Sequence, residues 1–163
     1  MKTLILVRHA KSSWTDASVS DFDRKLNDRG KHDAPVMAKR LAARELTIDA
    51  FISSPAKRAK KTAEIFTGEF KNIDIQLIPQ LYEASLQTWF AVIENLDDQY
   101  NSVVVFAHNP AITDFVNAMD VFPVFNIPTC GIYALKIHTN EWSQLQLANK
   151  EFLFFDYPKN GKD

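Results

Sequence analysis

The sequence contains one cysteine, no long apolar run and no excess of charge, and each absence excludes a class of protein. Because Cys130 is the single cysteine, the chain can form neither an intrachain disulfide nor a cysteine-rich zinc site, a usage that suits a reducing compartment. No apolar stretch approaches the roughly 20 residues that a membrane span needs. The formal net charge of -1 argues against general nucleic-acid binding, which usually requires a basic face or stripe.

The apolar residues near the start of the chain indicate a strand rather than a secretory leader. The run MKTLILV is too short for the apolar core of a leader, and Arg8-His9 ends it without a small-residue cleavage site. We therefore expect a buried strand over residues 4–7 and a cytoplasmic protein. A length of 163 residues fits one domain, covering residues 1–163 without a large lid insertion.

Short apolar runs alternate with amphipathic stretches along most of the chain, which is the pattern of a layered α/β domain. Apolar runs predict strands over residues 4–7, 50–53, 75–78 and 102–107. Helical spacing of apolar residues predicts helices over residues 27–46, from 54 to at least 66, 88–96 and 109–119. Asn27 is the expected N-cap of the first of these helices.

Two of the predicted helices begin with a polar residue followed by proline, at Ser54-Pro55 and at Asn109-Pro110. We expect Ser54 and Asn109 to cap these helices, with each proline at the first helical position. The last third of the chain has a β pattern that predicts a hairpin of strands 131–137 and 141–148. The expected fold is therefore a three-layer α/β/α sandwich with a mostly parallel central sheet and an antiparallel edge hairpin.

Three of the predicted strands end in polar residues that could carry chemistry. The first ends in Arg8-His9, the second in Ser53-Ser54 with Arg58 one turn into the following helix, and the third in His108. In a parallel sheet, ligands collect at the carboxyl ends of the strands, so these groups would share one crevice. Arginine guanidinium groups and helix N-termini both favour anions, and the sum is a pocket suited to a phosphoryl group.

A histidine in such a pocket can do more than bind an anion. A neutral imidazole nitrogen can attack phosphorus and hold the group as phosphohistidine, while the arginines stabilise charge on the phosphoryl oxygens. The leaving group then needs a proton, and a water molecule must later lose one. Glu83, in a predicted loop beside a helix start, is the best candidate for both proton transfers.

Four segments resemble, in their order along the chain, the signature blocks of the histidine phosphatase (phosphoglycerate mutase-like) superfamily. They cover residues 6–12 (LVRHAKS), 28–30 (DRG), 53–63 (SSPAKRAKKTA) and 106–109 (FAHN), and the match extends over residues 4–118. Ala10 stands where the superfamily usually has glycine. The short chain, the block RHAKSSW and the small insertion between the second and third main blocks resemble the SixA-type phosphohistidine phosphatases.

The resemblance implies a role for each matching residue. His9 would be the nucleophile; Arg8, Arg58 and His108 would clamp the phosphate, and Ser12 would lie near it. The implied reaction is hydrolysis of phosphohistidine in a protein, or of a small phosphorylated substrate, through a covalent phosphohistidine on His9. Neither a cofactor nor a metal is expected.

Two alternatives of different classes stay open. A phosphomutase would need room and basic groups for a second phosphate, and the short insertion after residue 64 argues against it. A non-catalytic phosphoprotein-binding module would keep the pocket but lack turnover. A metal site built from His9, His108 and Glu83 is disfavoured because two arginines in the same pocket would repel a dication.

The expected partners follow from the same pocket. They are a phosphorylated protein or a small phosphorylated molecule, with phosphate- or sulfate-type anions in the pocket, and neither nucleic acid nor a membrane. Two aromatic runs, at residues 122–125 and 152–157, have no part in this chemistry. We expect them to pack in the core, with the C-terminal segment laid over the sheet; an exposed patch for a protein partner is the alternative.

Overall fold

The structure, a computed structural model, describes residues 1–71 and 73–161. Within these residues a six-stranded sheet has the strand order β3-β2-β4-β1-β5-β6. Strands β1 to β4 pair in parallel, whereas β5 and β6 are antiparallel to their neighbours, so the expected mostly parallel sheet with an antiparallel edge is confirmed. The strands are β1 (Lys2–Arg8), β2 (Ala50–Ser53), β3 (Ile75–Leu77), β4 (Ser102–Ala107), β5 (Ile132–Ile137) and β6 (Lys150–Asp156).

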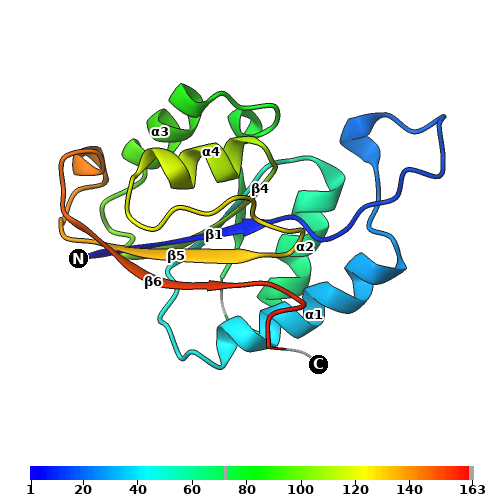
Figure 1. Ribbon diagram of the computed structural model, residues 1–163, viewed down its shortest axis with the longest axis horizontal. Coiled ribbons are helices and arrows are strands. Elements are labelled where there is room, and N and C mark those ends of the chain that lie inside the picture. Colours follow the sequence, from blue (N-terminus) through cyan, green and yellow to red (C-terminus); the bar gives the residue numbers. More distant parts are fainter. Residues whose placement is uncertain (72, 162–163) are drawn as a thin grey trace.

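Helices cover both faces of the sheet and complete the three expected layers (Figure 1). In the view of Figure 1, α1 (Asp28–Ala42) and α2 (Lys57–Thr67) lie below the sheet, and α3 (Leu86–Glu94) and α4 (Ala111–Ala118) lie above it. Three short 3-10 turns connect these elements: η1 (Asp21–Asp23), η2 (Pro79–Leu81) and η3 (Trp142–Gln144). Among the described residues, no helix has the length and apolar character needed to cross a bilayer.

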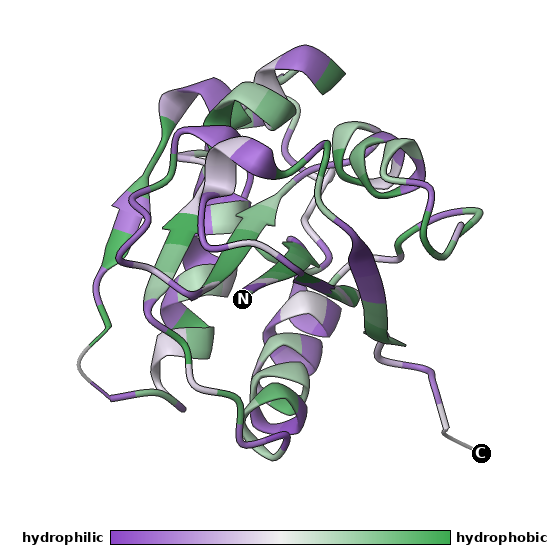
Figure 2. Cartoon of the chain, turned by 90° about the vertical axis from the view of Figure 1, so that its left-hand side faces the viewer, coloured by the Kyte–Doolittle hydropathy of each residue, from purple (hydrophilic) through white to green (hydrophobic). Residues whose placement is uncertain are grey.

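The two central strands are buried on both faces, which explains why their sequences are apolar without alternation. In β1, Ile5 and Val7 belong to the apolar core between the sheet and helices α1 and α2, while Leu4 and Leu6 belong to the core between the sheet and helices α3 and α4. Every residue of β4 is buried. Strands covered by helices on both sides read as continuous apolar runs, and Figure 2 shows the central strands mostly in the green of hydrophobic residues.

The order of the strands brings the predicted functional segments together. Strand β4 lies between β1 and β2 and runs parallel to both, with Arg8 paired to Ala107 and Ser53 paired to Phe106. The residues that follow the three strands therefore emerge together at the carboxyl end of the parallel strands. The expected convergence of three strand ends is confirmed.

The expected caps of α2 and α4 are wrong, because both polar side chains have other partners. Helix α2 begins at Lys57 and α4 at Ala111, each later than predicted. Ser54 Oγ lies 2.8 Å from His108 Nε2 and accepts from the Ala56 backbone N–H, and the Asn109 side-chain amide donates to the Ile127 carbonyl.

The other two helices differ from the prediction only at their ends. Helix α1 starts after its expected cap, since the Asn27 side chain accepts from the Gly30 N–H at 2.9 Å, but it ends at Ala42 rather than near residue 46. Helix α3 starts two residues earlier than predicted, because Ser85 caps it by accepting from the Thr88 N–H at 3.1 Å.

The second strand of the predicted hairpin is also wrong. Residues 141–148 contain η3 instead, because Trp142 is fully buried and its indole N–H donates to the Tyr100 carbonyl at 2.9 Å. The partner of β5 is β6, which contains most of the aromatic run at residues 152–157. Phe122 stacks on Phe152 of this strand with ring centroids 4.0 Å apart, whereas Phe125 is fully exposed.

Candidate active site

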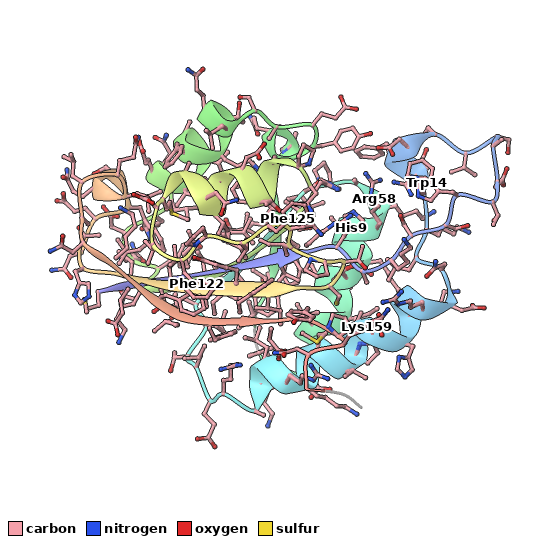
Figure 3. All side chains as sticks on the ribbon, in the orientation of Figure 1. His9, Trp14, Arg58, Phe122, Phe125 and Lys159 are labelled. Atoms are coloured by element: carbon pink, nitrogen blue, oxygen red, sulfur yellow. The ribbon has the colours of Figure 1, made fainter. Side chains whose placement is uncertain are left out.

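A pocket of about 400 Å³ opens where β1, β2 and β4 end, and its wall includes the six residues to which the sequence gave a catalytic or phosphate-binding role. Figure 3 shows His9 and Arg58 side by side at this end of the sheet, with Trp14 on the neighbouring loop. The predicted residues in the wall are Arg8, His9, Ser12, Arg58, Glu83 and His108.

His9 lies directly after β1 with its imidazole buried and held in one orientation. Its Nδ1 is 2.8 Å from the Ala10 carbonyl oxygen, which can only accept a hydrogen bond, so Nδ1 carries the proton and Nε2 keeps its lone pair. Burial lowers the pKa of His9 to about 3, and the charges of Arg58 and Arg8 add to this effect. His9 is therefore neutral at neutral pH, which is the state of a nucleophilic imidazole.

His108 follows β4 and stands beside His9, with the two ring centroids 5.2 Å apart. Burial lowers the pKa of His108 to about 3 as well, and the nearby Arg58 guanidinium contributes next. Its Nε2 lies 2.8 Å from Ser54 Oγ, so the hydroxyl that was expected to cap α2 orients this ring instead. The pocket thus holds two neutral imidazoles side by side.

Arg8 and Arg58 supply the positive charge that the sequence predicted. Arg58 comes from the first turn of α2, is buried, and donates through Nε to His9 Nε2 at 3.4 Å. Arg8 donates through Nη1 to the Ile127 carbonyl at 3.0 Å, and burial followed by the charge of Arg58 lowers its pKa. Two guanidinium groups beside a neutral imidazole form a site that attracts an anion to that imidazole.

A third arginine, Arg24, also lines the pocket, and the sequence reasoning did not identify it. It is buried in the loop before α1, donates through Nη1 to Ser12 Oγ at 2.5 Å, and stacks on the Trp14 ring at 3.4 Å. The loop has no regular apolar period, so nothing in its pattern marked this side chain as inward-facing. The one available signal is Leu26, a buried residue two positions further along an extended segment.

The two ends of the loop that carries Arg24 are hydrogen-bonded to each other beside the start of α1. The Asn27 N–H donates to the Lys11 carbonyl at 3.0 Å, and the Ser13 N–H donates to the Lys25 carbonyl at 2.8 Å. Gly30 packs so closely on Lys11 that a Cβ there would lie 2.1 Å from its carbonyl oxygen. The glycine of the DRG block therefore permits the contact that positions this loop over the pocket.

Asp21 holds two of the arginines from the opposite side of the pocket. Its carboxylate accepts from Arg58 Nη2 at 3.1 Å, from Arg24 Nε at 3.2 Å and from the Tyr82 hydroxyl at 2.7 Å. The Tyr82 hydrogen bond and then the Arg58 charge lower the pKa of Asp21 to about 2, against an opposing effect of burial. Asp21 stays ionised at neutral pH and fixes the guanidiniums; neither it nor Tyr82 was predicted from the sequence.

Glu83 lies in the exposed loop between η2 and α3, at the rim of the pocket. Its backbone φ of 54° is in the left-handed region, which costs a non-glycine residue on the order of 1 kcal/mol. Such conformations cluster at functional sites. The structure thus places Glu83 where a proton donor to a substrate could stand.

Comparisons with known proteins agree with this geometry. The profile of the histidine phosphatase superfamily (branch 1) matches residues 4–92. An uncharacterised protein of Mycobacterium leprae is 26% identical over 165 residues, which cover 94% of this chain and 100% of that protein. A structure from Agrobacterium tumefaciens assigned as the phosphohistidine phosphatase SixA is 27% identical and has a TM-score of 0.81, over 96% of this chain and 98% of that one.

The fold itself recurs at lower identity. The protein histidine phosphatase SixA complexed with tungstate is 21% identical and has a TM-score of 0.83, over 98% of this chain and 99% of that one. The family profile covers more than half of this chain, and its residues include the first two main blocks that carried the resemblance in the sequence. The chain therefore belongs to the histidine phosphatase superfamily (branch 1), with a SixA-type fold, and this membership supports phosphatase activity.

Proposed function

We propose that this protein is a metal-independent phosphatase that hydrolyses phosphohistidine in a protein, or a small phosphorylated substrate, through a covalent phosphohistidine on His9. The observation that carries the proposal is the state of His9. It is neutral, its Nδ1 proton is engaged by the Ala10 carbonyl, and its Nε2 lone pair faces the arginines of the pocket.

In the first step, His9 Nε2 attacks phosphorus and a new N–P bond forms while the bond to the leaving group breaks. Arg8, Arg58 and Arg24 surround the phosphoryl oxygens and stabilise the charge that they carry in the transition state. His108, beside His9, contributes a hydrogen bond to one of these oxygens. Fixed guanidinium charges thereby perform the electrostatic work that a divalent cation performs in other phosphoryl-transfer enzymes.

Proton transfer is assigned to Glu83. In the first step the carboxylic acid gives its proton to the departing oxygen or imidazole nitrogen, and in the second step the resulting carboxylate takes a proton from water. That water attacks the phosphohistidine, the N–P bond breaks, and inorganic phosphate leaves with His9 restored. The exposed position of Glu83 at the rim supports this assignment, because a leaving group departs toward solvent.

A phosphorylated side chain on a protein is the substrate that we favour. The wall of the pocket is completed by the loop before α1 and its exposed Trp14, and of the described residues between α2 and β4 only Tyr82 and Glu83 line it. Similarity to the SixA structure from Agrobacterium tumefaciens supports the same substrate class. By analogy with the tungstate-bound SixA, we expect tungstate to occupy the pocket of this protein.

The experiment that tests the proposal is a rapid-quench labelling reaction with a ³²P-phosphohistidine peptide. We expect acid-labile, alkali-stable label on the wild-type protein within one turnover, and none on the His9→Ala variant. Rates on the peptide and on small phosphoesters then rank the substrates. An unlabelled wild type with equal turnover in His9→Ala would reject the mechanism, and anion binding without hydrolysis of any substrate would indicate a binding module.

A further inference from the structure

A second groove lies next to the active-site pocket, on the face of the molecule covered by α1 and α2. It has a volume of about 380 Å³ and is lined by the end of the loop before α1, the first turn of α1 and one face of α2. Its wall carries five exposed lysines: Lys25, Lys31, Lys57, Lys60 and Lys61. We call it the lysine groove.

The lysines of α2 gather in the groove because of their spacing along the helix. Lys60 and Lys61 lie three and four residues after Lys57, and Glu64 lies four and three residues after them, which places all four on one side of the helix. The other side of α2 is buried against the sheet and carries Arg58 into the active-site pocket. One helix therefore serves the pocket with one face and the groove with the other.

The charge of the groove is unbalanced. Of the described residues that line it, Glu64 alone is acidic, and Glu64 Oε2 lies 3.9 Å from Lys61 Nζ. Across residues 1–71 and 73–161 no ion pair involves Lys25, Lys31, Lys57 or Lys60. Because the whole chain has a net charge of -1, this concentration of positive charge is local, and it attracts an anionic partner.

The wall of the groove also has an apolar component. Leu26 is its single uncharged residue, and the aliphatic stems of the lysines add further apolar surface below their ammonium groups. A small inorganic anion makes no use of such a surface, whereas a polypeptide backbone with acidic side chains contacts both the stems and the ammonium groups. Among the described residues, no aromatic side chain lines the groove to stack on nucleic-acid bases.

The groove and the pocket adjoin each other at two points of the chain. Arg24 and Arg58 line the pocket, and the residues directly after Arg24 and directly before Arg58, which are Lys25 and Lys57, line the groove. A polypeptide whose phosphorylated side chain enters the pocket therefore has this groove within reach of its flanking residues.

We propose that the lysine groove binds an acidic segment of the phosphorylated protein on which the enzyme acts. The proposal rests on the proposed function, since it adds a docking surface to the same substrate. It predicts that the affinity for a protein substrate depends on acidic residues away from the phosphorylated side chain. The affinity for a small substrate should not depend on the lysines of the groove.

The test uses two synthetic peptides that each carry one phosphohistidine and differ only in a flanking run of four glutamates or four glutamines. We expect wild-type protein to prefer the acidic peptide by about tenfold in kcat/KM through a lower KM, the sum of a few exposed ion pairs of modest strength. The Lys31→Glu/Lys60→Glu variant should lose this preference and keep its rate on free phosphohistidine. The matched control is Lys39→Glu/Lys71→Glu, which changes the net charge equally at exposed lysines outside the groove, toward the far ends of α1 and α2.

Binding of the same peptides without the phosphoryl group, followed by fluorescence polarisation at low and high salt, separates this proposal from the proposed function. Tighter, salt-sensitive binding of the acidic peptide that is lost only in Lys31→Glu/Lys60→Glu supports the groove even if phosphohistidine is not the substrate. Equal binding of the two peptides, or equal losses in both double variants, overturns it. Tighter binding of a single-stranded oligonucleotide of equal charge would overturn the assignment to a protein partner.

Discussion

The two buried histidines of the active site should make the folded protein sensitive to mild acid. Burial holds the pKa of His9 and of His108 near 3 in the folded state, whereas the ordinary value is 6.5. Between these pH values the two imidazoles bind protons in the unfolded chain but not in the folded one, so the free energy of unfolding falls as the pH decreases below 6.5. Above pH 6.5 both states leave the two imidazoles neutral, and the effect disappears.

The magnitude follows from the ordinary pKa alone, provided that both folded-state values lie well below the pH of the measurement. At pH 5.5 an unfolded histidine is mostly protonated, which lowers the free energy of unfolding by about 1.4 kcal/mol relative to pH 7.5. Two such histidines lower it by about 2.7 kcal/mol, a large share of the stability of a domain of this size. Asp21, whose pKa is about 2, stabilises the fold above pH 4 and loses that contribution only in stronger acid.

Urea unfolding at pH 7.5 and 5.5 in buffers without phosphate measures this difference directly. Between pH 7.5 and pH 5.5 the free energy of unfolding should fall by about 2.7 kcal/mol less in the His9→Gln/His108→Gln variant than in the wild type. The control is the His32→Gln/His138→Gln variant, in which both side chains are exposed, and it should behave as the wild type does. The reasoning fails if the wild type and the active-site variant lose equal stability on acidification.

Three further predictions concern activity. Arg24→Gln should lower kcat/KM on phosphohistidine by about 10- to 100-fold, the effect of one charge-assisted hydrogen bond. The control Arg29→Gln, outside the pocket, should change kcat/KM less than twofold. Equal losses of kcat/KM in the two variants would contradict a contact between Arg24 and the phosphate. Glu83→Gln should slow hydrolysis of an alkyl phosphate, whose leaving group needs a proton, by about 100-fold or more. Hydrolysis of nitrophenyl phosphate should slow far less in the same steady-state assay. Equal slowing of the two substrates would contradict proton donation by Glu83. Tyr82→Phe should weaken tungstate binding in calorimetry by about fivefold, because the lost hydrogen bond of about 1 kcal/mol fixes Asp21; unchanged affinity would show that Asp21 needs no such support.

The central strands and the convergence of their ends could be predicted from the sequence because few arrangements satisfy their patterns. Continuous apolar runs such as SVVVFA require burial on both faces, and a polar residue placed directly after such a strand must emerge at the edge of the sheet. His9 and His108 both occupy such positions. The apolar pattern of each strand and the order of the strands in the sheet therefore both indicate the carboxyl ends of the strands as the position of the site.

The parts that could not be predicted depend on competition between partners for the same side chain. Ser54 has every property of an N-cap, yet its hydroxyl bonds to His108, a residue 54 positions away. Residues 141–148 have a strand-like pattern, yet burying Trp142 with its N–H bonded to Tyr100 favours a turn. Such outcomes depend on neighbours that are brought close only by the completed fold.

The loop before α1 illustrates the same limit within the site. Arg24 and Asp21 act in the pocket although their loop has no apolar period, because its position is set by the contacts of Lys11 with Asn27 and Gly30. The DRG block signals that contact, but the side chains that the loop directs inward follow from its path and not from any repeat. The sequence could therefore identify the histidines of the site better than the full set of charges around them.

Those charges and the burial of the histidines have linked consequences for chemistry. In the free pocket, burial and the arginines keep His9 and His108 neutral, which leaves a lone pair on His9 for attack. A phosphoryl dianion that enters the pocket offsets the guanidinium charges and favours the protonated form of a neighbouring imidazole. His9 has its Nδ1 proton committed to the Ala10 carbonyl, whereas among the described residues His108 Nδ1 has no hydrogen-bond partner. In the proposed mechanism His108 is therefore the ring that takes up a proton. In the proposed mechanism the same positive pocket thus keeps His9 unprotonated before the substrate arrives and lets His108 become a donor once it has.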